Sequence, residues 1–323
     1  MNTIPENCVR VREDTLRSFS IEVLLAVGMG ESRAHMLSDL MLQSDLRGVF
    51  SHGTSFLPEY ADLMFQRKVN PRPDPRLSKD TGAMAVIDGD GGMGHFAAML
   101  AAETAREKAK ELGIGAASSG NHFHIGAAGL YSRKALEMNC IGFCVSAHRF
   151  YPDPNRSVLS ASGYSPMSFA IPAGEGPPVV IDMGCGVDHS DSLEQAFERT
   201  PASFFKMLGL GAVCHGLAGF MTGIWLQSRI ATGKWENANQ GAFVMAVDIE
   251  QFIPLDDFLG EITRHTDEIA KMCPAPGHSR AVLPGHLEWE REGEFRDAGI
   301  PIGTEHADRL RQLANRFNIS SPV

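Results

Sequence analysis

Apolar residues recur at helical spacing in the first part of the chain. Residues 13–27 and 32–42 read as two amphipathic helices, and Gly28 and Gly30 favour a break between them. A third helix is expected around Pro58, because this proline suits a first-turn position and apolar residues follow it at helical spacing. The pattern therefore predicts a helical N-terminal part.

The pattern changes after residues 70–75, which carry three prolines and read as a linker. Short apolar runs typical of strands occur at 85–87, 114–118, 141–146, 179–181 and 242–247. Further helical patterns occur at 95–112, 127–138, 255–271 and 305–317. The mixture predicts an α/β protein with a sheet-bearing centre.

Charge and cysteine usage narrow the class of protein. Lys and Arg number 29 against 39 Asp and Glu, a net charge of −10, so nucleic acid and anionic membrane surfaces are poor partners. Residues 207–226 have the length of a membrane span, but His215 and five glycines favour a buried helix. The six cysteines form no CxxC motif, and residues 1–10 carry no signal pattern, so we expect reduced thiols and a cytoplasmic protein.

A glycine-rich segment invites a dinucleotide-binding interpretation. Residues 89–94 read GDGGMG, which satisfies GxGxxG after a strand and before a helix. However, Asp88 and Asp90 would place carboxylates beside a pyrophosphate, and the strand ending near Ser119 offers no acid for the ribose hydroxyls. We therefore interpret the segment as a glycine-rich turn into a helix.

The first candidate for chemistry is the loop at residues 45–53, which reads DLRGVFSHG. His52 lies between a hydroxyl that can orient it, Ser51, and a residue with little bulk, Gly53. Imidazole titrates near neutrality, so His52 can donate or accept a proton at working pH. The alternative is a helix-junction histidine that is bonded to backbone.

The second candidate lies in residues 120–131, GNHFHIGAAGLY, where the chain leaves a strand and enters a helix. Free N–H groups at a helix start can face a bound ligand. His122 and His124 could suggest a metal, but no Asp or Glu accompanies them, so metal binding is disfavoured.

Taken together, these segments resemble one family. The DLRGVFSHG loop, LPEY at 57–60, HIGAAGLY at 124–131, KMLGL at 206–210, and PAPG and LPG at 274–277 and 283–285 occur in the order typical of the malate/L-lactate dehydrogenase family. The resemblance spans nearly the whole chain.

That resemblance implies a non-Rossmann α/β fold and, usually, a homodimer. It also implies an enzyme that transfers hydride between NAD or NADP and small hydroxy, oxo or imine substrates. It implies a helical part of residues 1–80 packed with 288–323, and a central cofactor-binding domain of residues 81–287. His52 with Ser51, and His124, would be the acid/base residues, and Tyr60 and Phe56 would line the substrate pocket. The implied cofactor contacts are Ser146, Tyr164, Ser165, Pro166, Asp182, Lys206, Leu283, Pro284 and Gly285.

Several positions depart from the family pattern. Phe56 stands where the family commonly has an arginine that can clamp a substrate carboxylate, which argues against a small oxo acid held in that way. Ala147 replaces an aspartate, Ser165 replaces the asparagine of a GTNP turn, and His215 and His286 replace acidic residues. The stretch at 183–205 is also shorter than its family equivalent. These changes keep altered or absent nicotinamide binding open.

Three functions follow, and the first is favoured. It is an NAD(P)-dependent oxidoreductase with a small-molecule substrate, in which His52 and His124 handle protons. The second is a redox-silent isomerase, lyase or decarboxylase on the same scaffold. The third is a non-catalytic binding protein, which would leave the two histidine segments without a purpose.

Overall fold

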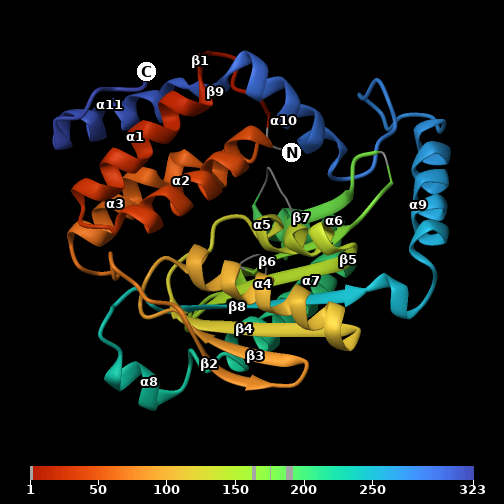
Figure 1. Cartoon of the computed structure of the whole chain (residues 1–323), viewed down its shortest axis with the longest axis horizontal. Helices are drawn as coiled ribbons and strands as arrows, with labels where there is room; N and C mark the ends of the chain where they lie inside the picture. The colour runs from red at the N-terminus through yellow and green to blue at the C-terminus, as the bar shows by residue number, and fades with distance from the viewer. Residues whose placement is uncertain (1–2, 162–164, 175, 187–191) are drawn as a thin grey trace. The chain divides into compact units, whose positions relative to one another are not determined.

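The computed structural model describes residues 3–161, 165–174, 176–186 and 192–323 (Figure 1). The chain forms two compact units. The helical unit comprises Met1–Asp74, Pro172–Val180 and Ile253–Val323, and the sheet unit comprises Pro75–Ile171 and Ile181–Phe252. Their first boundary falls within the proline-rich segment at 70–75.

The helical unit contains the predicted N-terminal helices. They are α1 (Glu13–Ala26), α2 (Glu31–Leu46) and α3 (Leu57–Phe65), with Pro58 in the first turn of α3. The unit also holds α9 (Leu255–Ala270), α10 (His286–Ala298), α11 (Thr304–Phe317) and an antiparallel pair of strands, β1 (Cys8–Val11) and β9 (Ile300–Gly303). Large apolar side chains fill its core, among them Leu16, Met41, Tyr60, Phe295 and Leu310. Burial of such apolar stripes stabilises helices that would be marginal alone.

The sheet unit is built on seven strands in the order β2-β3-β4-β8-β5-β6-β7. Their bounds are Arg76–Thr81, Met84–Asp88, Ile114–His122, Gln240–Asp248, Cys140–His148, Pro166–Ile171 and Val179–Gly184. β3 and β4 are parallel, whereas β4–β8, β8–β5 and β5–β6 are antiparallel. A sheet with this order and these directions is not the parallel sheet of a Rossmann fold, so the predicted non-Rossmann α/β fold is confirmed.

Helices cover both faces of this sheet. On one face lie α4 (Gly94–Leu112), α5 (Gly129–Ser132) and a 3-10 turn, Arg133–Met138. An added Cβ at Gly115 would lie 2.1 Å from Ala105 O, and one at Gly142 would lie 1.9 Å from Ser132 O. Glycine at these positions therefore lets the helices pack closely on the strands. On the opposite face lies the helix of α7 (Pro201–Cys214) and its π-helical continuation His215–Phe220. There an added Cβ at Gly241 would meet the carbonyl of Ala218 at 2.2 Å.

The prediction of a buried helix in residues 207–226 holds only in part. The helix forms and ends at Phe220. Cys214, His215 and Ala218 are buried, whereas Val213 and Phe220 are exposed. By length and composition alone, the helix Pro201–Phe220 is apolar enough to cross a membrane. Of its most apolar stretch, 33% of the residues are buried. The predicted helix at 127–138 is also shorter than expected, because only α5 is α-helical and the chain continues as a 3-10 turn.

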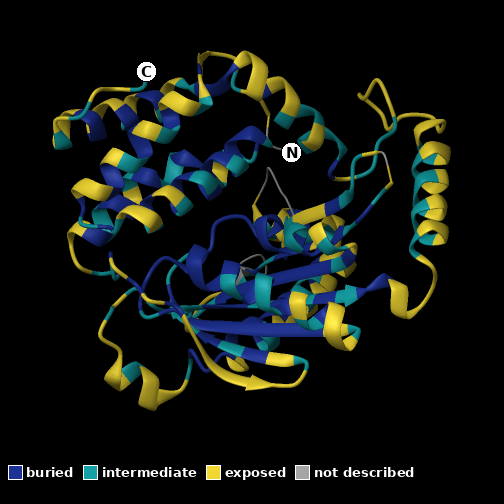
Figure 2. Cartoon of the chain, in the orientation of Figure 1, coloured by how far each residue is buried: buried dark blue, intermediate teal, exposed yellow. Residues whose placement is uncertain are grey.

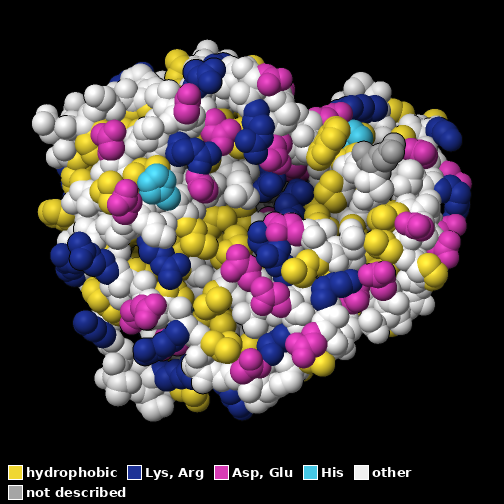
Figure 3. All heavy atoms as spheres, in the orientation of Figure 1, with side chains coloured by type: hydrophobic (Ala, Val, Ile, Leu, Met, Phe, Trp, Pro, Cys, Tyr) yellow, Lys and Arg dark blue, Asp and Glu magenta, His cyan; other side chains and the backbone are white. Residues whose placement is uncertain are grey.

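Burial differs strongly between elements. Figure 2 shows the central strands β4 and β8 largely buried, whereas α9 has no buried residue. In α9, Arg264 pairs with Glu268 at 3.1 Å, and Figure 3 shows acidic and basic side chains interspersed on the face drawn. Such exposed pairs are screened by water and contribute little stability.

The sequence analysis assigned residues 253–287 to the central domain. By their contacts these residues belong to the helical unit, and the predicted domain division stays a prediction.

Candidate active site

The loop that carries His52 consists of two 3-10 turns between α2 and α3, Phe50–His52 and Thr54–Phe56. Ser51 Oγ and His52 Nδ1 lie 2.9 Å apart, so the neighbouring hydroxyl orients the ring, as the sequence suggested. The His52 side chain is half-buried, and desolvation lowers its pKa below the ordinary value. The imidazole is therefore neutral at physiological pH and able to accept a proton.

A buried carboxyl, Asp45, holds this loop in place. Its Oδ2 accepts hydrogen bonds from the backbone N–H and the hydroxyl of Thr54, at 2.9 and 2.6 Å. Burial raises the pKa of Asp45 to about 7, although the hydrogen bonds from Thr54 oppose that shift. An added Cβ at Gly53 would lie 1.8 Å from Asp45 Oδ1, so the loop needs glycine beside His52. Sequence reasoning missed this role, although Asp45 begins the loop motif.

His306 of α11 extends the same cluster. Its Nε2 lies 3.4 Å from the hydroxyl of Thr54, and burial lowers its pKa to about 4. His306 is thus a neutral histidine packed against the loop from a distant part of the sequence. No motif in the sequence marked it.

Aromatic rings follow His52 toward α3. The ring centroids of His52 and Phe56 lie 6.0 Å apart, and those of Phe56 and Tyr60 lie 5.4 Å apart in a stacked arrangement. Tyr60 is fully buried, and desolvation together with Glu59 raises the pKa of its hydroxyl. The Phe56 ring therefore lies between the tilted ring of His52 and the stacked ring of Tyr60.

In the sheet unit, the glycine-rich turn at 89–94 supports the segment that carries His124. The amide of Gly91 donates to Asn121 O at 2.8 Å, and the amide of Gly94 donates to His124 O at 3.0 Å. Gly89 donates to Gly120 O and Gly92 to Gly89 O. Because these four glycine amides already have protein acceptors, they form no free cradle for a pyrophosphate. The interpretation as a turn into α4 agrees with the structure.

The histidines of this region differ in their surroundings. His122 is fully buried, its Nε2 lies 3.0 Å from Ser119 Oγ and its Nδ1 lies 2.7 Å from Phe123 O, and burial lowers its pKa to about 4. His124 is half-buried, and its ring stands edge-on to that of His95 of α4, with centroids 6.4 Å apart. His95 is fully buried, and an added Cβ at Gly126 would lie 2.6 Å from its Nε2. His95 is thus a supporting residue that sequence reasoning missed.

The predicted cofactor residues of the sheet unit divide between the two faces of the sheet. Ser146 pairs with Ala242 and lies on the α4 face by strand alternation. Asp182 belongs to the same face, because its Oδ2 accepts from the amide of Gly129 in α5 at 2.7 Å. On the α7 face, Ser165 Oγ lies 3.1 Å from Nδ1 of His215, and Lys206 is exposed on α7 itself.

The remaining predicted cofactor residues lie elsewhere. Pro166 begins β6, and Tyr164 lies outside the described residues. Leu283, Pro284 and Gly285 belong to the helical unit. There the carbonyl of Pro284 accepts from the amide of Val180 at 3.0 Å, and Gly285 has φ 96°, a left-handed conformation that favours glycine.

Comparison with known proteins gives a consistent assignment. The malate/L-lactate dehydrogenase family model matches residues 11–200 and 188–311. A malate dehydrogenase of Pyrococcus abyssi (strain GE5 / Orsay) is 28% identical over 98% of this chain and 97% of its own. A ureidoglycolate dehydrogenase (NAD(+)) of Escherichia coli O157:H7 is 22% identical over 91% of this chain and 93% of its own.

Among solved structures, the malate dehydrogenase of Pyrococcus horikoshii OT3 is 28% identical, covers 99% of each chain and superposes with a TM-score of 0.87. Both its fold and its sequence are therefore similar to those of this chain. The chain belongs to the malate/L-lactate dehydrogenase family and is an enzyme of the oxidoreductase class.

Proposed function

We propose that the enzyme transfers hydride between NAD or NADP and a small 2-hydroxy acid, 2-oxo acid or imine. Family membership supports this proposal, and so do the names of its relatives, which include malate dehydrogenases and a ureidoglycolate dehydrogenase (NAD(+)). The observation that carries it is the geometry of the His52 loop, where a half-buried neutral imidazole is oriented by the adjacent Ser51 hydroxyl.

His52 and His124 are proposed as the acid/base residues. When a hydroxyl group is oxidised, its proton must leave as the hydride departs, and a neutral imidazole can accept that proton. In the reverse direction, the imidazolium returns it to the developing alkoxide or amine. The bound nicotinamide supplies or accepts the hydride itself. The kinetics of single and double variants decide how the two histidines share the proton transfer.

The chemistry of the residues present fits a dinucleotide only in part. Lys206 is an exposed cation on α7 and has no salt bridge among the residues that the structure describes, so it could pair with a phosphate. The hydroxyl of Ser146 could hydrogen-bond a ribose or amide group. By contrast, Asp182 and Ser165 already have protein partners, so their proposed contacts need rearrangement or sharing.

Phe56 directs the proposal toward a substrate with an uncharged or apolar group near His52. An arginine at this position could form a bidentate pair with a carboxylate, whereas a phenyl ring offers only dispersion and aromatic contacts. We therefore propose a hydroxy or oxo substrate, or an imine, that carries an apolar substituent at this point.

We also propose a cytoplasmic homodimer. All six cysteines are free thiols, which suits a reducing compartment. The exposed apolar side chains Phe205, Val213 and Phe220 on the helix of α7 suit a surface that a second copy covers. Light scattering after size-exclusion chromatography tests the dimer, and a monomer at micromolar concentration would refute it.

A titration with NADH and NADPH tests the function. The proposal predicts saturable binding of one of the two cofactors, followed by its oxidation when a panel of oxo acids and cyclic imines is added. Turnover of a substrate without any nicotinamide would instead support an isomerase, lyase or decarboxylase, and the departures at Ala147 and Ser165 keep that second function in the test.

A further inference from the structure

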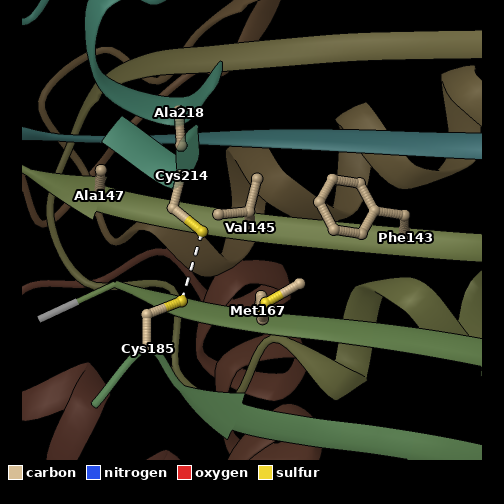
Figure 4. Packing of buried hydrophobic residues seen from close by; sticks show 7 residues of the cluster. All are labelled: Phe143, Val145, Ala147, Met167, Cys185, Cys214 and Ala218. Atoms are coloured by element: carbon tan, nitrogen blue, oxygen red, sulfur yellow. Dashed lines mark hydrogen bonds between the residues drawn. The ribbon is translucent and has the colours of Figure 1, made fainter. Parts of the chain in front are cut away.

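Two cysteines from different elements of the sheet unit meet beneath its surface (Figure 4). Cys185 follows the end of β7, and Cys214 is the last residue of α7. Their sulfur atoms lie 3.4 Å apart, and their side chains are 0% and 1% exposed. A separation of this size brings each sulfur within reach of the other.

The surroundings give this pair no structural need for sulfur. The two side chains pack with Val145, Met167 and Ala218 in one apolar cluster, in which small aliphatic residues would fill the same space. Neither thiol belongs to the proposed proton or hydride transfer. The two sulfur atoms lie within hydrogen-bond distance, and either thiol can donate. Donation by Cys214 lowers the pKa of Cys185. The contact therefore favours the thiolate, the reactive form, at Cys185.

The pair lies close below solvent. Gly184, the chain neighbour of Cys185 at the end of β7, is exposed. A small oxidant can therefore reach the pair through a local opening at the end of β7.

We propose that Cys185 and Cys214 form a reversible dithiol–disulfide site whose oxidant is a peroxide. The Cys185 thiolate attacks one peroxide oxygen, the O–O bond breaks and water leaves after protonation, so that Cys185 becomes a sulfenic acid. Cys214 sulfur then attacks the Cys185 sulfur, the S–O bond breaks, and a second water leaves. Two thiols lose two electrons and two protons in total, and one peroxide becomes two waters.

The disulfide links the end of β7 to the end of α7 across 29 positions of sequence. Closing such a loop restricts the unfolded chain more than the folded one. The oxidised protein should therefore unfold at a higher urea concentration than the reduced protein. The link also adjoins Ser165, whose carbonyl accepts from the amide of Cys185 at 2.9 Å.

The test treats the full chain with a small excess of hydrogen peroxide, alkylates the remaining thiols with iodoacetamide, and maps the peptides by mass spectrometry. We expect a cross-linked peptide pair that contains Cys185 and Cys214, lighter by two hydrogen atoms and separated by dithiothreitol. Cys185→Ala and Cys214→Ala should each abolish it, whereas Cys8→Ala, at an exposed cysteine, should leave it unchanged.

A second measurement uses the unaltered chain, so that it does not depend on the folding of a variant. Phenylarsine oxide bridges two thiols at close range, and it should protect Cys185 and Cys214 together from iodoacetamide that is added after unfolding in urea. The proposal is overturned if peroxide consumes exposed Cys8 and Cys273 while both buried thiols stay alkylatable after unfolding. It is also overturned if Cys185 accumulates as sulfinic acid with no cross-link.

Discussion

The backbone amide of Gly94 donates a hydrogen bond to the carbonyl of His124 at 3.0 Å. The first residue of α4 thus fixes the backbone of the candidate acid/base histidine. The glycine-rich turn that imitates a dinucleotide fingerprint serves here to position the segment after β4. An added Cβ at Gly94 would lie 2.3 Å from Phe123 O and 2.6 Å from His122 Nδ1.

Gly94→Ala should therefore impair activity by moving the His124 segment. A displacement of about 1 Å at a reacting group costs on the order of a hundredfold in rate, so we expect kcat/KM to fall by about that factor. The control is Gly260→Ala in α9, where an added Cβ meets nothing within 4 Å. Steady-state kinetics of both variants make the comparison, and equal activities would show that the turn does not position His124.

Substitutions of Asp45 should separate hydrogen bonding from charge. Asp45→Ala leaves the buried donors of Thr54 without an acceptor and should destabilise the protein by about 2 kcal/mol. Asp45→Asn keeps an acceptor and removes the ionisation. The folded pKa of Asp45 is about 7 against an ordinary 3.8, so its stability contribution is present below pH 3.8 and is lost as the pH rises toward 7.

The asparagine variant should consequently gain stability, relative to the unaltered protein, on going from pH 5.5 to pH 8. Urea denaturation at these two pH values measures the difference. A gap that stays constant across the range would show that Asp45 is ionised in the folded state throughout.

His306 should make stability depend on pH in the opposite direction. Its folded pKa is about 4, whereas the unfolded imidazole binds a proton near 6.5. Between these values the unfolded state binds more protons, so stability should fall as the pH decreases from about 6.5 to about 4. His306→Gln should flatten this part of the profile in urea denaturation. An unchanged slope would assign the pH dependence to other groups, such as the buried His122.

The pH profile of catalysis should report His52. The pKa of His52 lies below the ordinary 6.5. When the pH falls below this lowered pKa, His52 becomes protonated, and kcat/KM for oxidation of a hydroxyl substrate should decline. His52→Asn should lose about 10²- to 10⁴-fold in kcat, the usual contribution of a general acid/base residue. Ser51→Ala, which removes the orienting hydroxyl, should lose less and shift the profile. A full-activity His52→Asn enzyme would exclude this residue as the base.

Phe56→Arg should change substrate preference. A guanidinium beside His52 could pair with a carboxylate, so KM for a dicarboxylic substrate should fall by about tenfold. Tyr60 would lose its stacked partner, and Phe56→Leu serves as the control for that loss. If both variants change KM alike, Phe56 contributes packing and not selectivity.

The sequence predicted the regular elements well because their patterns are local. Helices α1, α2 and α4 and strands β3, β5 and β8 lie where apolar periodicity placed them. The exposure of α7 could not be read in this way, because an apolar helix has the same composition whether it is buried or exposed.

Contacts between residues that are distant in the sequence could not be predicted either. The contacts of Thr54 with His306 and of Gly94 with His124 join positions that no spacing rule connects. His52 and His124 could be proposed from short motifs, whereas Asp45 and His95 needed the folded chain. The raised pKa of Asp45 results from burial, so it can be inferred only when the residues around the carboxyl are known.

Isotope transfer tests the central claim most directly. The enzyme is given NADH or NADPH deuterated at the transferred position together with a panel of oxo acids and cyclic imines, and the products are analysed by mass spectrometry. The account predicts one deuterium on the carbon that becomes the hydroxyl or amine carbon, and a strong loss of labelled product in His52→Asn and His124→Asn. Unlabelled product formed at the same rate without any nicotinamide would contradict it.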